Sequence, residues 1–331
     1  MKFRAIFGAA ALVLGAWAAR AEDIATSAAL PVDGLQFVGF YVANDAHLFE
    51  QQGLAVKQVV IAGIGSFNAV VAGSIDFSFS SGASLARAAS HGQRMLAIAN
   101  MNNEPSWTIE VRGDITEAAH FDPKAPLATR AKILAGHTIS VQSYNSVEHA
   151  YLKIIAKEGG IDPESITVAP MQPQDAMAAL SRKAIDGLVS APPWAQQAEV
   201  DLKTVPIASG FMSDPAWMKP MSNSIVVTRP QLCAEHREIC VKMGHAMAAS
   251  AKLIHDQPEV ALGILKKRFA SMNQAVIDSS FVFLRRATPE VPNVSVEGLE
   301  NGDRINIDAG FMKPEEKLKS YDGLYSNEFL R

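Results

Sequence analysis

The chain has 331 residues, of which 30 are Lys or Arg and 34 are Asp or Glu, giving a formal net charge of −4. This acidic balance argues against a nucleic acid as partner. The length is sufficient for two lobes of ordinary domain size, and beyond residue 21 no stretch of the sequence approaches the roughly 20 apolar residues of a transmembrane helix.

The N-terminus has the pattern of a secretory signal peptide. Two basic residues precede the apolar run "AIFGAAALVLGAWAA" (5–19), and "ARA" at 19–21 is a cleavage sequence. Cleavage after Ala21 would leave 310 residues and, since three of the 30 basic residues lie in the signal, a net charge of −7. A segment that stays attached as an anchor is the alternative. We expect an exported protein located in the periplasm.

The next part of the chain alternates between strand and helix. Apolar periodicity and a Gly at helix ends predict a strand at 34–42, a helix at 44–53, a strand at 55–63, a helix at 66–73, the strand "IDFSFS" at 75–80, a helix at 82–91 and a strand at 94–101. Such alternation indicates a mainly parallel sheet covered by helices.

The same order recurs further along. "AVVAGSID" ends at Asp76 and "ALSRKAID" ends at Asp186, 110 residues later, and each Ile-Asp pair opens a short strand that a helix follows. An internal repeat of this length indicates two similar lobes. Both aspartates precede their strands, at the end away from a ligand site in such sheets, so we interpret them as structural. The second module comprises a strand at 138–144, a helix at 146–160, a strand at 165–171, a helix at 173–183 and a strand at 184–190.

Two isolated strands, at 107–114 and 222–230, are predicted to cross between the lobes, and long helices follow over 237–286. Two lobes joined by two crossing strands make a hinge with a central cleft. We expect lobe 1 to comprise residues 22–111 and 221–331, and lobe 2 to be inserted as residues 112–220.

Cys233 and Cys240 are the only cysteines. An even pair in an exported chain suggests a disulfide. Seven residues of one continuous helix span about 10.5 Å, which is too far for a disulfide. The predicted bridge therefore requires a break in the helix, and two free buried thiols are the alternative.

Ligands of open α/β sheets bind beyond the carboxyl ends of the strands. The segments at these positions are rich in Gly, Ser, Asn and aromatic residues and lack Lys and Arg. Ser66 and Ser146 are predicted helix N-caps, where free N–H groups favour an anion, although such a Ser often only caps its own helix. The aromatic side chains either wall a pocket or belong to the core. The predicted ligand-binding residues are Phe40, Tyr41, Gly65, Ser66, Ser81, Ser84, Trp107, Tyr144, Asn145, Ser146, Pro192 and Trp194.

The sequence contains no nucleotide-binding loop, no H-E-x-x-H, no G-x-S-x-G and no C-x-x-C motif. Its eight His residues are scattered, so their spacing predicts neither a metal site nor a catalytic triad. We therefore expect a protein that is not an enzyme and holds no cofactor and no metal.

Four segments carry motifs of a known family: "AHLFEQQGLAV" (46–56), "VVAGSIDFSFSS" (70–81), "ILAGHTISVQSYNS" (133–146) and "AALSRKAIDGLVSAPPW" (178–194). They resemble the periplasmic substrate-binding proteins of ABC importers, in the SsuA-like group for aliphatic sulfonates, nitrate and thiamine precursors. The sequence departs from the family pattern at 46–47, at 182–183, where Arg-Lys replaces a Gly, and at Asn145, where Gly is common. These departures leave the ligand class open.

The resemblance implies the type II periplasmic-binding-protein fold, in which two α/β lobes with a two-stranded hinge close over one small molecule. It implies a monomeric component of an ABC transporter that captures a small organic ligand, anionic and of sulfonate or aromatic type, and delivers it to the permease and ATPase complex at the inner membrane. The alternatives are a sensory binding protein for a membrane receptor and a thiamine-pyrimidine-related enzyme on the same fold.

Overall fold

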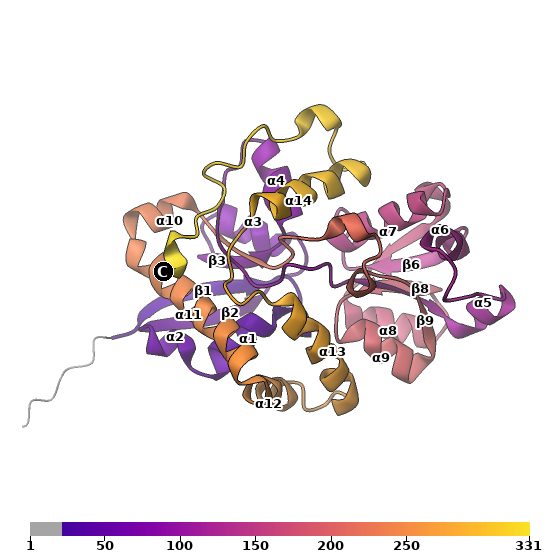
Figure 1. The fold of residues 1–331 in the computed structure, drawn as a ribbon, viewed down its shortest axis with the longest axis horizontal. Coiled ribbons are helices and arrows are strands. Elements are labelled where there is room, and N and C mark those ends of the chain that lie inside the picture. Colours follow the sequence, from indigo (N-terminus) through magenta and orange to yellow (C-terminus); the bar gives the residue numbers. More distant parts are fainter. Residues whose placement is uncertain (1–21) are drawn as a thin grey trace, which may run out of the picture.

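The computed structural model describes residues 22–331. The predicted signal peptide and its cleavage site lie outside the described residues. The described part of the chain contains no helix that is both long enough and apolar enough to cross a membrane. Two five-stranded sheets organise the chain into two lobes that lie side by side (Figure 1). The predicted α/β fold with two lobes is confirmed.

The sheet of lobe 1 has the strand order β2-β1-β3-β10-β4. The strand β1 pairs in parallel with β2 and β3, whereas β10 is antiparallel to β3 and to β4. One strand thus departs from the mainly parallel arrangement. The strands are β1 (Ile24–Leu30), β2 (Leu54–Val60), β3 (Phe77–Ser80), β4 (Leu96–Asn100) and β10 (Ile225–Thr228).

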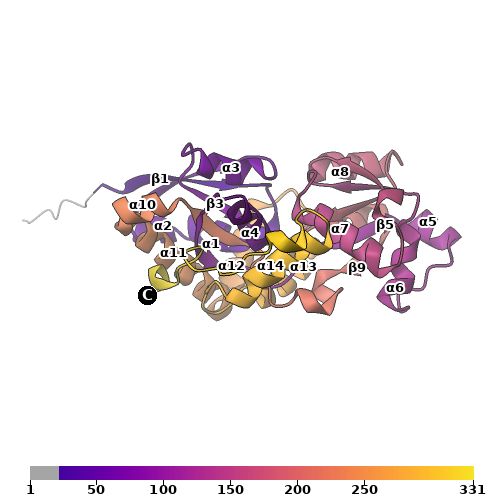
Figure 2. The same cartoon turned by 90° about the horizontal axis from the view of Figure 1, so that it is seen from above.

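The sheet of lobe 2 repeats this arrangement, with the order β7-β6-β8-β5-β9. Here β6 is parallel to β7 and β8, and β5 is antiparallel to β8 and β9. Each strand of lobe 1 therefore has a counterpart, and Figure 2 shows the corresponding helices α3 and α8 on the same side of the two lobes. The strands are β5 (Thr108–Arg112), β6 (Thr138–Val141), β7 (Thr167–Pro170), β8 (Gly187–Ser190) and β9 (Thr204–Ser209).

Helices cover both sheets, and each lobe contains an apolar core, although that of lobe 2 also includes Ala83, Ile305 and Ala309 from lobe 1. The long C-terminal helices predicted over 237–286 are confirmed as three helices packed on lobe 1, whereas the later helix α14 was not predicted. Lobe 1 carries α1 (Val38–Asp45), α2 (Leu48–Gln51), α3 (Gly65–Val71), α4 (Gly82–Ser90), α10 (Pro230–Glu235), α11 (Arg237–Asp256), α12 (Pro258–Arg268), α13 (Gln274–Ala287) and α14 (Val296–Asp308); lobe 2 carries α5 (Gly113–Ala118), α6 (Leu127–Arg130), α7 (Val147–Glu158), α8 (Pro173–Ser181) and α9 (Trp194–Leu202).

The repeated aspartates tie the start of the third strand to its neighbour in each sheet. In lobe 1, Asp76 Oδ2 accepts hydrogen bonds from the Ser27 N–H at 2.9 Å and from the Thr26 hydroxyl at 3.0 Å. In lobe 2, Asp186 Oδ2 accepts a hydrogen bond from the Thr138 N–H at 2.9 Å. A carboxylate that accepts backbone N–H bonds fixes strand register at this edge. The repeat is therefore a structural device, as its position before the strands indicated.

An arginine accompanies each of these aspartates. Arg112, at the end of β5, lies 3.2 Å from Asp186, and Arg229, just after β10, lies 3.8 Å from Asp76. Since β5 and β10 are corresponding strands, the two ion pairs are corresponding contacts of the two lobes.

The missing glycine of the second repeat has a conformational explanation. Gly73 adopts a φ of 77°, and Lys183, at the corresponding position three residues before the aspartate, adopts a φ of 57°. A non-glycine residue in this left-handed region is unfavourable, so contacts of the side chain are needed to hold it. The Lys183 ammonium lies 2.7 Å from Asp114.

The two segments that join the lobes are not the predicted strands. The strands β5 and β10 each pair only within one sheet, and the chain crosses between the lobes at residues 101–107 and 210–224. These segments bond to each other, because the Met101 N–H donates to the Ser224 carbonyl at 2.7 Å and the Met221 N–H donates to the Asn103 carbonyl at 2.8 Å. The boundaries 111/112 and 220/221 remain a prediction, and sheet membership favours moving the first to about residue 107.

The predicted strand at 34–42 was wrong. This segment forms a short 3-10 turn followed by α1, and the first strand is β1, which the prediction missed. A short apolar run cannot be assigned to a strand or to a buried helix by periodicity alone, and α1 is buried over Val38–Ala43. The sequence of β1, "IATSAAL", is rich in Ala, has no aromatic residue and contains only two of the β-branched residues typical of strands, Ile24 and Thr26.

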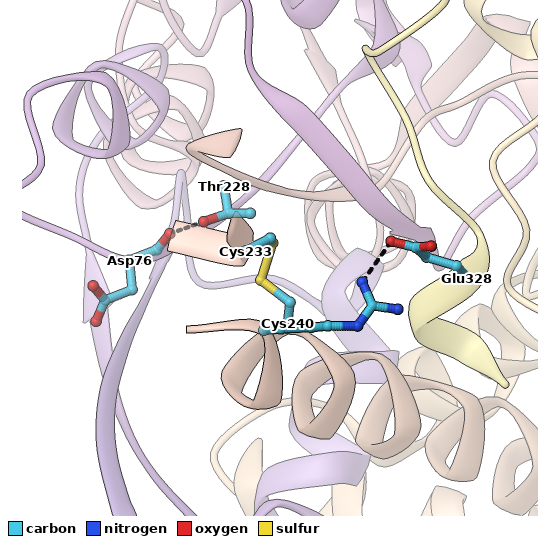
Figure 3. The surroundings of a disulfide bond; sticks show 6 residues. Asp76, Thr228, Cys233, Cys240 and Glu328 are labelled. Atoms are coloured by element: carbon cyan, nitrogen blue, oxygen red, sulfur yellow. Dashed lines mark hydrogen bonds and ion pairs between the residues drawn. A yellow bond between two sulfur atoms is a disulfide. The ribbon is translucent and has the colours of Figure 1, made fainter. Parts of the chain in front are cut away.

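The predicted disulfide between Cys233 and Cys240 is confirmed, with the two Cα atoms 5.5 Å apart. The helix does break between them, since α10 ends at Glu235 and α11 begins at Arg237. Figure 3 shows the bridge close to Thr228, whose hydroxyl donates to the Asp76 carbonyl at 2.7 Å. The disulfide thus holds the turn that follows β10, as a local covalent contact.

Lobe 2 contains a buried carboxyl group whose protonation affects stability. Glu110 in β5 is fully buried, its Oε2 accepts a hydrogen bond from the Thr204 hydroxyl at 3.0 Å, and its Oε1 has no partner among the described residues. Burial raises the pKa of Glu110 well above its ordinary value, and the neighbouring Glu199 carboxylate raises this pKa further. The folded state therefore holds this proton more tightly than the unfolded state.

We expect Glu110→Gln to stabilise the protein at mildly alkaline pH. The stability that Glu110 contributes is present below its pKa in the unfolded chain and is lost as pH rises through the raised pKa. Removing the charge should increase the free energy of unfolding by about 1 kcal/mol, measured by urea denaturation, with little change at acid pH. Glu158→Gln, at the exposed end of α7, is the control. A variant that is less stable than the parent at alkaline pH would contradict this account.

Candidate functional site

A cleft between the two lobes contains two adjoining hollows. The first encloses about 660 Å³, including the solvent at its mouth, and the second encloses about 350 Å³. The cleft lies at the carboxyl ends of β1, β2, β3, β4 and β6, which is where ligands bind in open α/β sheets. The first hollow is lined by Pro31, Val32, Gln36, Phe37, Gly63, Ile64, Ser66, Phe79, Ser80, Ser81, Ser84, Asn102, Ser106, Trp107, Gln142, Asn145, Ser146, Val147, Glu148, Asn223 and Ser224.

The second hollow extends the first into lobe 2, and the two share Val32, Gln36, Gln142 and Glu148. Apart from these four, it is formed mainly by the ends of β6 and β8 and by the first turns of α8 and α9. Its other lining residues are Ser140, Val141, Met171, Pro173, Ala176, Leu188, Val189, Ser190, Ala191 and Trp194. A ligand in this cleft would touch both lobes.

Three hydrogen bonds cross between the lobes around the cleft. Gln142 Nε2 donates to the Pro31 carbonyl at 2.9 Å, and Arg87 Nη2 donates to the Asn145 carbonyl at 2.9 Å. Trp194 Nε1 donates to the Asp33 carbonyl at 3.4 Å. The lobes are therefore in contact in this conformation.

Seven of the twelve predicted ligand-binding residues lie in the cleft. Five of them lie in loops after strands or at helix starts, where ligands of open α/β sheets are expected to bind. Both tryptophans line the cleft, although their side chains are also largely buried. Ser66, Ser81, Ser84, Trp107, Asn145 and Ser146 line the first hollow, and Trp194 lines the second.

The structure does not bring the other five to the cleft. Phe40 and Tyr41 lie in α1 and are fully buried in the core of lobe 1, because the segment is a helix and not a strand end. Tyr144 is 57% exposed and points its hydroxyl to the Val168 carbonyl. Gly65 and Pro192 belong to the correct loops but line neither hollow.

The two predicted helix N-caps have different outcomes. Ser146 caps α7, since its Oγ accepts a hydrogen bond from the His149 N–H at 3.3 Å. The prediction for Ser66 was wrong, because α3 begins at Gly65 and the Ser66 hydroxyl donates to the Gly63 carbonyl at 3.1 Å. Asn145, before the cap, adopts a φ of 60°, a conformation for which Gly and Asn are the usual residues.

Sequence reasoning missed the amide and carboxyl side chains of the cleft. Gln36, Gln142 and Glu148 line both hollows, and Asn102 and Asn223 line the first. The strand-end rule could have found Gln142, which directly follows β6 in the loop "QSYNS". Nothing in the sequence distinguished Glu148, because an acidic residue in the first turn of a helix is common for reasons of helix stability alone.

Glu148 is the only ionisable side chain that lines either hollow within residues 22–331. It is 8% exposed, and its Oε2 has no hydrogen-bond partner in the described chain. Burial raises the pKa of the Glu148 carboxyl, while its own N–H and the Ser146 hydroxyl act in the opposite direction. The remaining polar lining is neutral and consists of hydroxyl and amide groups.

The polar lining of the cleft consists of one carboxyl group together with neutral hydroxyl and amide groups. Among residues 22–331 no group of three or more His, Cys, Asp and Glu side chains could hold a metal ion. The described lining contains no Cys, His or Lys side chain, and both cysteines form the distant disulfide. What the arrangement can do is enclose a small molecule, contact it from both lobes and hydrogen-bond it.

The sequence matches the profile of one protein family. The profile of the NMT1/THI5-like family matches residues 35–261, which is more than half of the chain. The matched segment includes most of both predicted modules and the cleft residues from Gln36 to Ser224. None of the curated protein sequences compared with the chain matches it.

Several solved structures share the fold at low sequence identity. A protein from Bordetella bronchiseptica RB50 has a TM-score of 0.77 at 15% identity, with 93% of this chain and 96% of that chain covered. The alkanesulfonate-binding protein SsuA from Xanthomonas axonopodis pv. citri, bound to MOPS, has a TM-score of 0.69 at 17% identity, with 88% and 94% covered. The desulfurization enzyme DSZB has a TM-score of 0.62 at 13% identity, with 93% and 97% covered. At such identities the likeness establishes the fold.

Proposed function

We propose that this chain, which belongs to the NMT1/THI5-like family, is the periplasmic solute-binding component of an ABC transporter. It would capture one small organic molecule in the cleft and deliver it to the permease and ATPase complex at the inner membrane. The observation that supports this most is the cleft, which lies at the strand ends of both lobes, and in residues 22–331 two segments connect these lobes.

The fold connects ligand capture to a change of shape. The lobes contact each other around the cleft and between α7 and α14, where the Lys157 ammonium donates to the Asp308 carbonyl. The crossing segments 101–107 and 210–224 join the lobes covalently and permit hinge motion. A ligand that touches both lobes binds the closed arrangement more tightly and shifts the equilibrium towards it. A permease that recognises the closed form would then accept only loaded protein.

The main alternative function is that of an enzyme on the same fold, because the desulfurization enzyme DSZB has a similar structure. We do not propose it, because Glu148 is the one ionisable side chain of the described lining, and no Cys, His or Lys side chain accompanies it there as a nucleophile or acid. A sensory protein would share every feature of the cleft and differ only in its membrane partner.

A thermal-shift screen tests the proposed function. The panel holds alkane- and arenesulfonates, aromatic carboxylates, pyrimidines and small amines. We expect at least one compound to raise the melting temperature, because a ligand at 100 times its Kd adds about 2.7 kcal/mol of stability. Incubation with the same compound should leave it chemically unchanged. Conversion of a bound compound into product would support the rival enzyme.

A further inference from the structure

We propose that the ligand presents a positively charged or N–H-donating nitrogen to the carboxylate of Glu148. The inference rests on the proposed function, because it concerns the molecule that the cleft captures. It specifies one end of that molecule, and it was not expected from the sequence, which favoured an anion.

The first observation is the position of Glu148. Its side chain lines both hollows of the cleft and therefore stands where they meet. It is 8% exposed, and its Oε2 has no hydrogen-bond partner among the described residues. A buried carboxylate that lacks a partner is unfavourable, and a ligand cation that supplies the partner removes this penalty on binding.

The second observation is that the basic side chains near Glu148 make their contacts with other groups. Arg87 donates to the Asn145 carbonyl at 2.9 Å, and its guanidinium lies 5.6 Å from the ring centre of Phe311. His149 accepts a hydrogen bond from the Asn145 N–H through Nδ1 at 3.1 Å, and burial lowers its pKa, which disfavours the charged ring. Neither side chain lines either hollow.

The charged groups on the opposite wall do not compensate Glu148 either. Asp33, beside the lining residue Val32, accepts a hydrogen bond from the Tyr41 hydroxyl at 2.5 Å and adds no positive charge. No basic side chain of the described residues lines either hollow, and burial raises the pKa of Glu148 against the opposing contacts of its own N–H and of Ser146. The field at this point of the cleft is therefore negative when Glu148 is ionised.

The rest of the cleft accepts other groups. Hydroxyl and amide side chains such as Ser84, Asn102 and Ser224 line the first hollow, and the Ser224 Oγ has no partner among the described residues. These groups suit a polar or anionic end of the same molecule. The inference therefore concerns the nitrogen-bearing end and is compatible with a sulfonate at the other.

Affinity as a function of pH separates two roles of Glu148. If its carboxylate binds a cation, affinity falls as pH decreases through the raised pKa, because the protonated group no longer attracts a positive charge. If the protonated acid donates a hydrogen bond to an anion, affinity rises over the same range. His149 gains a proton at acid pH in both cases, so the Glu148→Gln variant must be titrated in parallel.

The test uses three probes of similar shape: benzamidine, 4-(aminomethyl)benzenesulfonate and benzenesulfonate. Calorimetric titration of the full mature protein at mildly alkaline pH should show that the two nitrogen-bearing probes bind more tightly than benzenesulfonate. Glu148→Gln should weaken their binding by about tenfold or more and strengthen that of benzenesulfonate. Glu158→Gln, the same change at the exposed end of the same helix, should alter none of the three affinities. Circular dichroism confirms that each variant is folded.

The inference is overturned if benzenesulfonate binds the parent protein as tightly as the nitrogen-bearing probes, or if Glu148→Gln leaves their ratio unchanged. Failure of all three probes to bind at millimolar concentration also overturns it, because a preformed carboxylate site should take an amidinium. Another solute from the thermal-shift panel could bind tightly with the same affinity to the parent protein and to Glu148→Gln. This result would support the proposed function and reject only the contact between Glu148 and a ligand nitrogen.

Discussion

Asp186→Ala should lower the free energy of unfolding by about 3 kcal/mol and leave ligand affinity nearly unchanged. The carboxylate accepts a hydrogen bond from the Thr138 N–H at 2.9 Å and lies 3.2 Å from Arg112, so its removal breaks the contact between β6 and β8 and takes one of the two carboxylate partners from Arg112. Because Asp186 precedes β8, it lies at the end of the sheet away from the cleft. Urea denaturation and calorimetric titration measure the two quantities.

Asp114→Ala is the matched control, because Asp114 also contacts Arg112, at 3.0 Å, but its side chain is 48% exposed. An exposed ion pair contributes little, so this variant should lose less than about 1 kcal/mol. If the Asp186→Ala protein were folded and as stable as the parent but no longer bound ligand, our assignment of the site to the carboxyl ends of the strands would be wrong.

Trp194→Ala should raise the Kd of the tightest compound from the screen by about tenfold to a hundredfold. The indole lines the second hollow, so truncation removes an apolar wall worth about 1.5–3 kcal/mol. The same change removes the hydrogen bond from Trp194 Nε1 to the Asp33 carbonyl, which joins the lobes in the closed form. Trp194→Phe keeps an aromatic ring but loses this hydrogen bond. It should therefore weaken the binding free energy less than Trp194→Ala does, by about 0.5–1.5 kcal/mol relative to the parent protein.

Trp217→Ala is the control for the loss of an indole. Trp217 stacks against Arg304, whose guanidinium lies 3.8 Å from the ring centre, and it lines neither hollow. This variant should change stability and leave Kd unaltered. Equal affinities for the parent protein and for folded Trp194→Ala would remove the second hollow from the binding site.

The sequence revealed the scaffold better than the site, and the repeat explains why. In each lobe the aspartate of the Ile-Asp pair accepts a hydrogen bond from a backbone N–H of the neighbouring strand. Both lobes need this acceptor at the same position. Such local requirements leave a trace in one sequence. Which surfaces of the two lobes face each other depends on the tertiary structure. Sequence reasoning therefore did not detect Gln36 and Glu148 as cleft residues.

Misplaced aromatic residues illustrate the same limit. Phe40 and Tyr41 have the composition of a pocket wall, but the segment folds as the buried helix α1, and Tyr41 instead donates its hydroxyl to Asp33. Tyr144 was expected in the cleft, yet its loop turns the ring outwards. Residue type alone does not distinguish a core aromatic from a pocket aromatic, whereas position at a true strand end, as for Ser81 after β3, does so more often.

The central claim is that the two lobes close over one small molecule, and small-angle X-ray scattering of the mature protein tests it most directly. With the tightest compound of the screen at saturation, the account predicts a smaller radius of gyration than without it. Trp194→Ala, which lacks one bond between the lobes, should need more compound to reach the same compaction. A radius of gyration that is unchanged at saturation would contradict a closing cleft.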